Sequence, residues 1–335
     1  MKRLEAPAPD DRRVWDIWMS AFHFQALAVA DELGVFGLFM GEPANAADVA
    51  SRLGLNPLAA GQLLSTLAAL GFLTYEDGRF GLTDEARNFL LPASPFYWGP
   101  GLAYFRQIAV SFDRLREVLH SPRWTPDRAE PGSPDAEEAA RFTRAMHSLS
   151  MPAAMAVARR GDFDGVRRLL DVGGGSGSYC IALALEHPDL ALTVLERPQV
   201  LPTTQDFIAG YGLQRRIDTV GFDLFSAPWP SEYDAHFFSN VFHDFDAELC
   251  RWLASSSYGS LPSGGRVYAH EVLVDDTKDA PLTSVTFSLA MTYFNEAGGQ
   301  YTAGEIEAFL GDAGFRDVRC MPTYGYYSLV SATKP

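Results

Sequence analysis

The sequence predicts an α/β protein in which a doubly wound, mostly parallel sheet with an antiparallel C-terminal strand follows a mainly helical domain. Short apolar runs alternate with helical patterns through the second half of the chain. A glycine-rich turn, Asp171-Val-Gly-Gly-Gly-Ser-Gly177, links the first of these runs to a helix. Only Pro322–Gly325 separates the last two runs, which is too short for a helical crossover, so we expect them to pair antiparallel.

Length and charge limit the possible functions. The 335 residues suggest two domains, which we place at 1–100 and 101–335, with a helical, substrate-lining linker at about 101–165. The net charge, 27 − 42 = −15, opposes binding to nucleic acid or anionic membranes. No signal sequence or long apolar span is evident. The three cysteines, Cys180, Cys250 and Cys320, are odd in number and lie in apolar segments, so no disulfide framework is indicated. We expect a cytoplasmic protein with three buried thiols.

The first domain has the pattern of a winged helix. Helical spacing covers Phe22–Leu38 and Ala46–Leu53, and Asn56-Pro57 opens a third helix that continues to Leu70. A hairpin with an Asp77-Gly78 turn then spans Phe72–Leu82. The third helix contains no Lys or Arg and is apolar on nearly every side. It therefore favours contact with another subunit over contact with DNA.

The segment from Pro92 to about Arg160 is helical and aromatic, and residues 121–134 carry four prolines, which predicts a surface loop or lid. The expected strands beyond it are Leu169–Val172, Leu192–Leu195, Ile217–Val220, His236–Val241, Arg266–Val274, Val318–Met321 and Tyr326–Ala332.

The glycine spacing distinguishes two classes of cofactor. Gly173, Gly175 and Gly177 recur at every second residue, whereas a dinucleotide fingerprint would need its third glycine at the position of Ser178. This favours S-adenosylmethionine over NAD. Asp171 can accept hydrogen bonds from nearby donors, and the two oxygens of Glu196, at the end of the next strand, can bind both ribose hydroxyls.

Four segments resemble the S-adenosylmethionine-dependent O-methyltransferases typified by plant caffeate and flavonoid enzymes and by bacterial antibiotic-tailoring enzymes. They are Asp171–Gly177, Glu196-Arg-Pro198, Val220–Phe225 and Asn240-Val-Phe-His-Asp-Phe-Asp246. The resemblance covers nearly the whole chain. It implies a winged-helix domain that forms a homodimer, followed by a Rossmann-like methyltransferase domain.

The resemblance also implies site residues. Asp223, Leu224 and Phe225 would contact the adenine, with Phe245 stacking near it, and Arg197 would lie beside Glu196. Ser150, Ser239 and Asn240 would lie near the methionine end of the cofactor. The residues that would line the acceptor pocket are Met146, Met151, Phe287, Met291, Tyr293 and Phe294. Their composition suggests a flat, aromatic acceptor from secondary metabolism.

His243 is the candidate general base, since open α/β sheets place their chemistry at the carboxyl ends of strands. A phenol has a pKa of about 10 and imidazole about 6.5, so complete proton transfer before methylation would cost roughly 5 kcal/mol. Proton removal should therefore accompany methyl transfer, and by the resemblance Glu271 orients the histidine.

Three positions depart from the family pattern at the acceptor. Gln300 replaces the second glutamate that flanks the histidine and Tyr301 replaces an arginine, while Ser288 replaces an aspartate of the substrate helix. Gln300 can form hydrogen bonds but carries no charge. C-methylation of an electron-rich ring such as a phenolic amino acid, or N-methylation, therefore stays open beside O-methylation.

Three further functions are compatible with the sequence and less favoured by it. They are an NAD-dependent oxidoreductase, a winged-helix regulator that senses S-adenosylmethionine, and a methyltransferase fold that uses the cofactor for another rearrangement. The other six histidines, His23, His120, His147, His187, His236 and His270, show no metal-ligand spacing, so we expect no metal.

Overall fold

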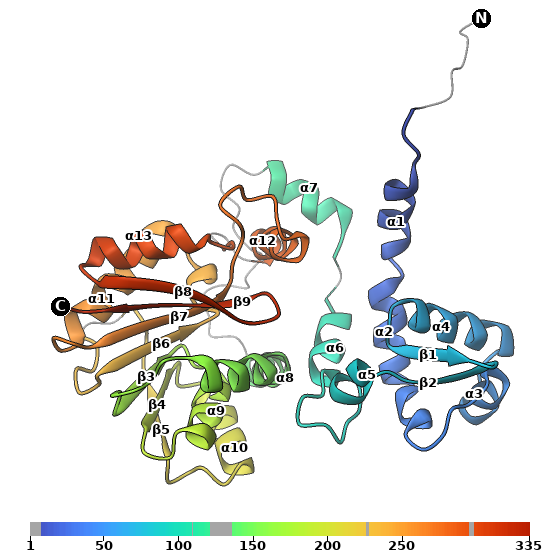
Figure 1. Cartoon of the computed structure of the whole chain (residues 1–335), viewed down its shortest axis with the longest axis horizontal. Helices are drawn as coiled ribbons and strands as arrows, with labels where there is room; N and C mark the ends of the chain where they lie inside the picture. Colours follow the sequence, from blue (N-terminus) through green and yellow to red (C-terminus); the bar gives the residue numbers. More distant parts are fainter. Residues whose placement is uncertain (1–7, 109, 121–135, 226–227, 295–297) are drawn as a thin grey trace, which may run out of the picture. The chain divides into compact units, whose positions relative to one another are not determined.

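The computed structural model describes residues 8–108, 110–120, 136–225, 228–294 and 298–335, which form two compact units within 1–108 and 109–335 (Figure 1). Each unit contains a hydrophobic core of its own. The loop or lid expected at 121–134 lies outside the described residues.

The first unit combines helices with one hairpin. Its elements are α1 (Arg12–Ser20), α2 (His23–Glu32), η1 (Phe36–Phe39), α3 (Ala46–Leu53), α4 (Pro57–Ala69), β1 (Leu73–Glu76), β2 (Arg79–Leu82), α5 (Asp84–Phe89) and α6 (Gly99–Arg106). The helix predicted for Phe22–Leu38 is interrupted, because Gly34 adopts a positive φ of 69° and ends it.

Local sequence signals set the ends of α3, α4 and the hairpin. Asn45 caps α3 through the amide of Asp48, and Gly54 ends that helix in the left-handed conformation. Asn56 caps α4. Asp77 and Gly78 both have positive φ, as a tight two-residue hairpin turn requires. The helix–helix–hairpin arrangement expected from the sequence is confirmed.

No residue of helix α1 is buried by the residues that the structure describes. Val14, Ile17 and Trp18 are 71%, 69% and 60% exposed, although they lie three and four residues apart on one face. This apolar face has no partner among the described residues of the first unit.

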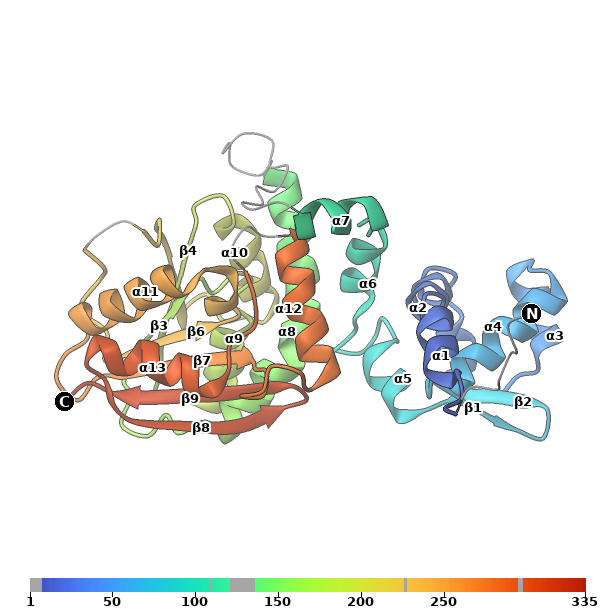
Figure 2. The same ribbon diagram turned by 90° about the horizontal axis from the view of Figure 1, so that it is seen from above.

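The second unit contains a mixed sheet of seven strands, ordered β5-β4-β3-β6-β7-β9-β8 (Figure 1). Figure 2 shows β9 and β8 together at one margin of this sheet. Its strands are β3 (Arg168–Val172), β4 (Ala191–Glu196), β5 (Ile217–Gly221), β6 (Ala235–Ser239), β7 (Arg266–Val272), β8 (Arg316–Tyr324) and β9 (Tyr327–Thr333). Strands β3 to β7 pair in parallel, and β9 pairs antiparallel with both β7 and β8. The predicted fold class is confirmed.

Helices cover both faces of this sheet. The helical elements of the unit are α7 (Phe112–His120), α8 (Ala136–Arg160), α9 (Ser178–Glu186), α10 (Leu201–Gly210), η2 (Phe242–Asp244), α11 (Ala247–Ser260), α12 (Leu282–Phe294) and α13 (Ala303–Ala313). Helices α9 and α10 cover one face together with α8, while α11 and α13 cover the other (Figure 1).

The register aligns the carboxyl ends of the central strands. Val172 is paired with Leu195, Glu196 with Gly221, and Ser239 with His270. The strand order reverses between β3 and β6, which makes the turn after β3 a topological switch point. Ligands of open α/β sheets bind there, so the residues that follow these strands form the candidate site.

Several expected details differ from the structure. Strand β6 stops at Ser239 because Asn240 adopts a φ of 56°, and β7 ends at Val272. Strand β8 runs from Arg316 to Tyr324 with register shifts, so the turn begins later than expected. Cys180 and Cys250 are buried, but the expectation for Cys320 is wrong: it is exposed on the edge strand β8. None of the described helices is long and apolar enough to cross a bilayer.

Candidate active site

The turn after β3 is held in place through its own backbone. The amide of Gly173 donates to the carbonyl of Leu195 at 2.8 Å, and that of Gly175 donates to Oε2 of Glu196 at 3.0 Å. Gly173, Gly175 and Gly177 have φ values of 70°, 54° and 75°, which L residues adopt at a cost. A Cβ at Gly175 would meet no atom within 4 Å, so the loop presents bare backbone to open space at this position.

Asp171 lies beneath this loop and is 1% exposed. Its Oδ2 accepts a hydrogen bond from the Cys180 thiol at 3.6 Å, whereas Oδ1 has no hydrogen-bond partner among the described residues. Burial raises the pKa of Asp171 to about 7, and the charge of Glu196 acts in the same direction. The cationic or amide donor expected for Asp171 is therefore not supplied by the described residues.

Glu196 ends β4 beside the loop. Its Oε1 accepts from the amide of Arg197 at 2.8 Å, and the Arg197 side chain, 54% exposed, places Nε 3.8 Å away. Both carboxylate oxygens thus lie where the chain turns away from the sheet. The position agrees with the expected role in ribose binding, which stays a prediction.

The adenine candidates follow β5 and η2. Asp223 accepts a hydrogen bond from the amide of Phe225 at 3.1 Å, and the Leu224 carbonyl accepts from Trp229 Nε1 at 3.0 Å. Phe225 and Phe245 meet edge to face with ring centroids 5.3 Å apart, and Phe225 is 46% exposed. The structure therefore brings the predicted aromatic pair together beside the end of β5.

Ser239 and Asn240 leave β6 next to a buried histidine. Ser239 Oγ lies 3.5 Å from His270 Nδ1, and Asn240 Nδ2 donates to Ser239 Oγ at 3.3 Å. Asn240 Oδ1 is buried, and none of the residues that the structure describes forms a hydrogen bond to it. Together with Asp171 Oδ1, it provides a second unused oxygen acceptor at this edge of the sheet, as a cationic ammonium group would require.

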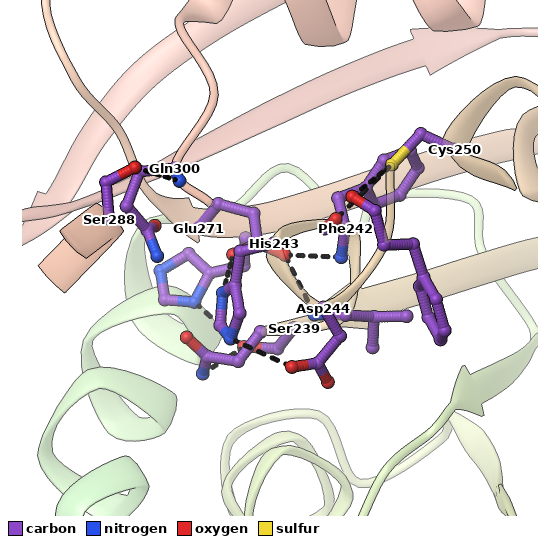
Figure 3. A network of polar contacts seen from close by, with 12 residues as sticks. Ser239, Phe242, His243, Asp244, Cys250, Glu271, Ser288 and Gln300 are labelled. Atoms are coloured by element: carbon purple, nitrogen blue, oxygen red, sulfur yellow. Dashed lines mark hydrogen bonds and ion pairs between the residues drawn. The ribbon is translucent and has the colours of Figure 1, made fainter. Parts of the chain in front are cut away.

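His243 and Glu271 form a buried pair. His243 Nδ1 lies 2.7 Å from Glu271 Oε2, and Glu271 Oε1 accepts from the amides of Val241 and Phe242 at 2.8 and 2.9 Å (Figure 3). An ionised carboxylate can only accept hydrogen bonds. Oε1 accepts from the two amides, and Oε2 therefore accepts from the Nδ1–H of His243. The lone pair of the histidine is then on Nε2, as a general base needs.

The electrostatic surroundings of His243 favour its protonated form. Burial, the largest influence, lowers the pKa, but the charge and hydrogen bond of Glu271, together with the charge of Asp244, outweigh it. The pKa of His243 is therefore raised above its ordinary value. Asp244 Oδ1 lies 3.8 Å from Nε2.

Gln300 is 6% exposed, and within the described part of the chain neither its Nε2 nor its Oε1 has a hydrogen-bond partner. Its backbone amide donates to Ser288 Oγ at 3.1 Å, so two of the departures from the family pattern are in contact. The carboxamide points toward Glu271 and His243 (Figure 3). The third departure, Tyr301, donates from its hydroxyl to the carbonyl of Phe245 at 2.8 Å.

The acceptor candidates are only partly brought together. The ring of Phe287 lies 5.3 Å from that of His243, and a Cβ on Gly298 would meet both Met291 and the His243 carbonyl. Phe294, in contrast, is 41% exposed at the end of α12. The hydroxyl of the buried Tyr293 accepts from the Ser111 amide at 3.1 Å. On α8, Met151 is buried, and Met146 and Ser150 are partly exposed.

Sequence reasoning missed two side chains that contact the glycine loop. Thr204 of α10 donates to the carbonyl of Gly175 at 2.6 Å, and His147 of α8 lies 2.9 Å from Ser176 Oγ. Neither residue is part of a motif. Helical periodicity would have placed both in the interior, but it would not have identified their partner.

The chain matches two family models and several characterised proteins. An O-methyltransferase domain matches residues 128–316, and an O-methyltransferase dimerisation domain matches residues 15–92. The 3-hydroxy-5-methyl-1-naphthoate 3-O-methyltransferase of Streptomyces sahachiroi is 35% identical over 91% of this chain and 89% of its own. The L-tyrosine C(3)-methyltransferase of Streptomyces lavendulae is 30% identical over 93% of this chain and 88% of its own.

A solved structure titled PigF with SAH superposes with a TM-score of 0.79 at 26% identity, and the match covers 97% of this chain and 100% of that one. The unpartnered oxygens of Asp171 and Asn240 and the exposed glycine backbone fit S-adenosylmethionine. The chain belongs to the S-adenosylmethionine-dependent O-methyltransferase family.

Proposed function

We propose that this enzyme methylates a hydroxyl group of a small aromatic metabolite, with His243 as the general base. One observation carries the proposal: a buried histidine with its Nδ1 2.7 Å from a buried glutamate follows the end of β6, the strand beside the one that leads into the glycine loop. S-Adenosylmethionine supplies a methyl carbon bonded to a positively charged sulfur.

The chemistry at His243 follows from its tautomer. As the acceptor oxygen forms its bond to the methyl carbon, the hydroxyl proton moves to Nε2 and the electrons of the carbon–sulfur bond remain with sulfur. Glu271 keeps its hydrogen bond to Nδ1 and stabilises the imidazolium that forms. The raised pKa of His243 reduces the mismatch with a phenol of pKa about 10.

Cofactor binding is assigned to the strand ends. We place the ribose at Glu196 beside Arg197, the adenine against Phe245 and Phe225 near Asp223 and Leu224, and the amino-acid end near Gly173–Gly177. Asp171 and Asn240 would accept hydrogen bonds from the ammonium group, with Ser239 and Ser150 nearby. The buried, unpartnered oxygens of Asp171 and Asn240 support this orientation.

The acceptor would lie against Phe287 and Met291, with Met146 and Met151 on α8 as further candidates and Gln300 forming hydrogen bonds to it. The aromatic ring 5.3 Å from His243 favours a flat acceptor. The naphthoate named for the Streptomyces sahachiroi relative is the first compound to test.

The test uses S-adenosylmethionine with a carbon-13 methyl group and a panel of phenols and hydroxynaphthoates. A methoxy carbon in the product spectrum supports the proposal. In His243→Asn, kcat should fall roughly a hundredfold or more, while S-adenosylhomocysteine still binds. Undiminished kcat in this variant would remove His243 from the mechanism.

C-Methylation is the second candidate, favoured by the neutral Gln300 and Ser288 and by the relative named as a tyrosine C(3)-methyltransferase. In that case the labelled methyl group would appear on a ring carbon in the same spectrum.

We further propose a homodimer formed through the first unit, because α1 exposes an apolar face within the family's dimerisation domain. A cytoplasmic location is proposed from the three free cysteines, which suit a reducing compartment. The negative net charge argues against a nucleic-acid partner.

A further inference from the structure

His147 is a buried histidine with no part in the proposed methyl transfer. It lies on α8, is 8% exposed, and places Nδ1 2.9 Å from the hydroxyl of Ser176. Ser176 is itself 4% exposed and lies between Gly175 and Gly177 in the glycine loop. The two residues are far apart in the sequence, so only the fold brings them together.

A second helix fixes both the imidazole and the loop. The His147 ring stacks on Phe207 of α10, with centroids 3.7 Å apart and planes inclined by 14°. One turn earlier on α10, Thr204 donates to the carbonyl of Gly175 at 2.6 Å. Consecutive residues of the loop, Gly175 and Ser176, are thus held by side chains from two different helices.

His147 is neutral in this environment. Burial lowers its pKa to about 4, and no other group shifts it. The neighbouring side chains that hold the ring, Ser176, Phe207 and Tyr211, carry no charge at neutral pH. A neutral imidazole keeps one N–H and one acceptor nitrogen, so it can hydrogen-bond to Ser176 without placing a charge beside the loop.

We propose that His147 is a positioning residue for the cofactor: through Ser176 it holds the glycine loop in the conformation that binds the amino-acid end of S-adenosylmethionine. Glycines at positive φ leave the loop many alternative conformations, and a ligand that had to order it would lose affinity. Anchoring Ser176 before the ligand arrives removes part of that ordering cost.

The test measures S-adenosylhomocysteine binding to the full-length protein by calorimetry. In His147→Leu the apolar packing on Phe207 remains but the hydrogen bond is lost, and the dissociation constant should rise about threefold to tenfold. His147→Asn places an amide N–H near the Nδ1 position and should restore most of the affinity. Ser176→Ala removes the same hydrogen bond by deleting the hydroxyl group, so its dissociation constant should rise by the same factor as that of His147→Leu.

The double variant and a control separate positioning from general stability. If the two residues act through one bond, His147→Leu with Ser176→Ala should bind no more weakly than either single variant. His187→Leu is the matched control. His187 Nε2 lies 2.7 Å from the carbonyl oxygen of Ala158, and neither residue belongs to the glycine loop, so this variant should bind S-adenosylhomocysteine with unchanged affinity.

Wild-type affinity in both folded single variants, or equal losses in the His187 control, would overturn the proposal. If His147→Leu fails to fold, as judged by circular dichroism, Ser176→Ala alone decides between these outcomes.

Discussion

Glu196 and Glu271 both lie at the carboxyl ends of strands of the same sheet, yet their surroundings give them different roles. Glu271 is 2% exposed and accepts hydrogen bonds from two amides and from His243, so both of its oxygens are engaged within the protein. Glu196 is partly exposed, and its two oxygens accept one amide each, which leaves acceptor capacity for a ligand. The degree of burial and the number of hydrogen bonds within the protein therefore distinguish Glu271, which orients His243, from Glu196, which we propose binds the ligand.

The Glu271→Gln substitution tests the orienting role. It removes the negative charge that raises the pKa of His243, so this pKa should fall and the acidic limb of the kcat profile should move to lower pH. The maximal kcat should drop as well, because the imidazolium loses its counter-charge. Steady-state kinetics across pH would measure both effects, and an unmoved acidic limb would contradict the assignment.

Asp171→Asn tests the buried acid beneath the loop. The folded-state pKa of about 7 lies above the ordinary 3.8, so the folded protein loses stability as pH rises from about 4 to 7. Asparagine cannot ionise, so the ligand-free variant should be more stable than the wild type at pH 8 in urea unfolding. S-Adenosylhomocysteine should bind about tenfold more weakly, because the carboxylate no longer faces its ammonium group. Unchanged affinity would exclude that contact.

At the scale of elements, the glycine loop can be tested with a matched pair of substitutions. Gly175 and Gly212 have φ values of 54° and 71°, and a Cβ at either would meet no atom within 4 Å. Alanine at each should cost about 1–2 kcal/mol of stability through backbone strain. Only Gly175→Ala should also weaken S-adenosylhomocysteine binding, since its methyl group would occupy the ligand's side of the loop. Calorimetry on both variants would reveal this, and equal affinities would place the ligand elsewhere.

At the scale of the whole molecule, the exposed apolar face of α1 predicts a homodimer interface. A single charged side chain introduced into this face should weaken the dimer. Ile17→Asp places a carboxylate at a position 69% exposed in the single chain, so it should fold normally yet sediment as a monomer. Leu185→Asp, at a position 51% exposed on α9, is the control and should remain dimeric. Analytical ultracentrifugation would compare them; a dimeric Ile17→Asp protein would move the interface away from this face.

Acid stability is a second whole-molecule property. Burial lowers the pKa of His147 to about 4 and those of His236 and His270 to about 3. Their stabilising contributions are complete above pH 6.5 and are lost as pH falls toward 4, because the unfolded chain binds protons that the folded chain excludes. Asp171 has the opposite effect, because its raised pKa lets the folded protein bind one proton that the unfolded chain does not bind between about pH 7 and 4. The free energy of unfolding should therefore decrease on acidification.

Urea unfolding at pH 7, 6 and 5 would measure this decrease. In His236→Leu the free energy of unfolding should fall less steeply with decreasing pH, by about 1.4 kcal/mol per pH unit. The unfolded variant lacks the imidazole of His236, so it takes up one proton fewer than the unfolded wild type. A slope equal to that of the wild type would contradict the assignment of a buried neutral imidazole.

Much of this architecture was predictable because its signals are local. The Asp77-Gly78 hairpin, the caps at Asn45 and Asn56 and the glycine turn after β3 each depend on backbone preferences of a few adjacent residues. The helix expected for Phe22–Leu38 was wrong at Gly34, where one residue in the left-handed conformation ends α2. Cys320 was misjudged because an edge strand exposes residues that a central strand would bury.

The sequence by itself determined the fold class and the class of cofactor, because these follow from motifs whose spacing reflects local geometry and strand order, and its resemblance to the family predicted that Glu271 orients His243. Tertiary structure alone decided which acceptors remain without partners, that Gln300 meets Ser288, and that His147 meets Ser176. Such contacts join helices and loops distant along the chain. Their existence depends on packing across the sheet, for which neither periodicity nor spacing carries a signal.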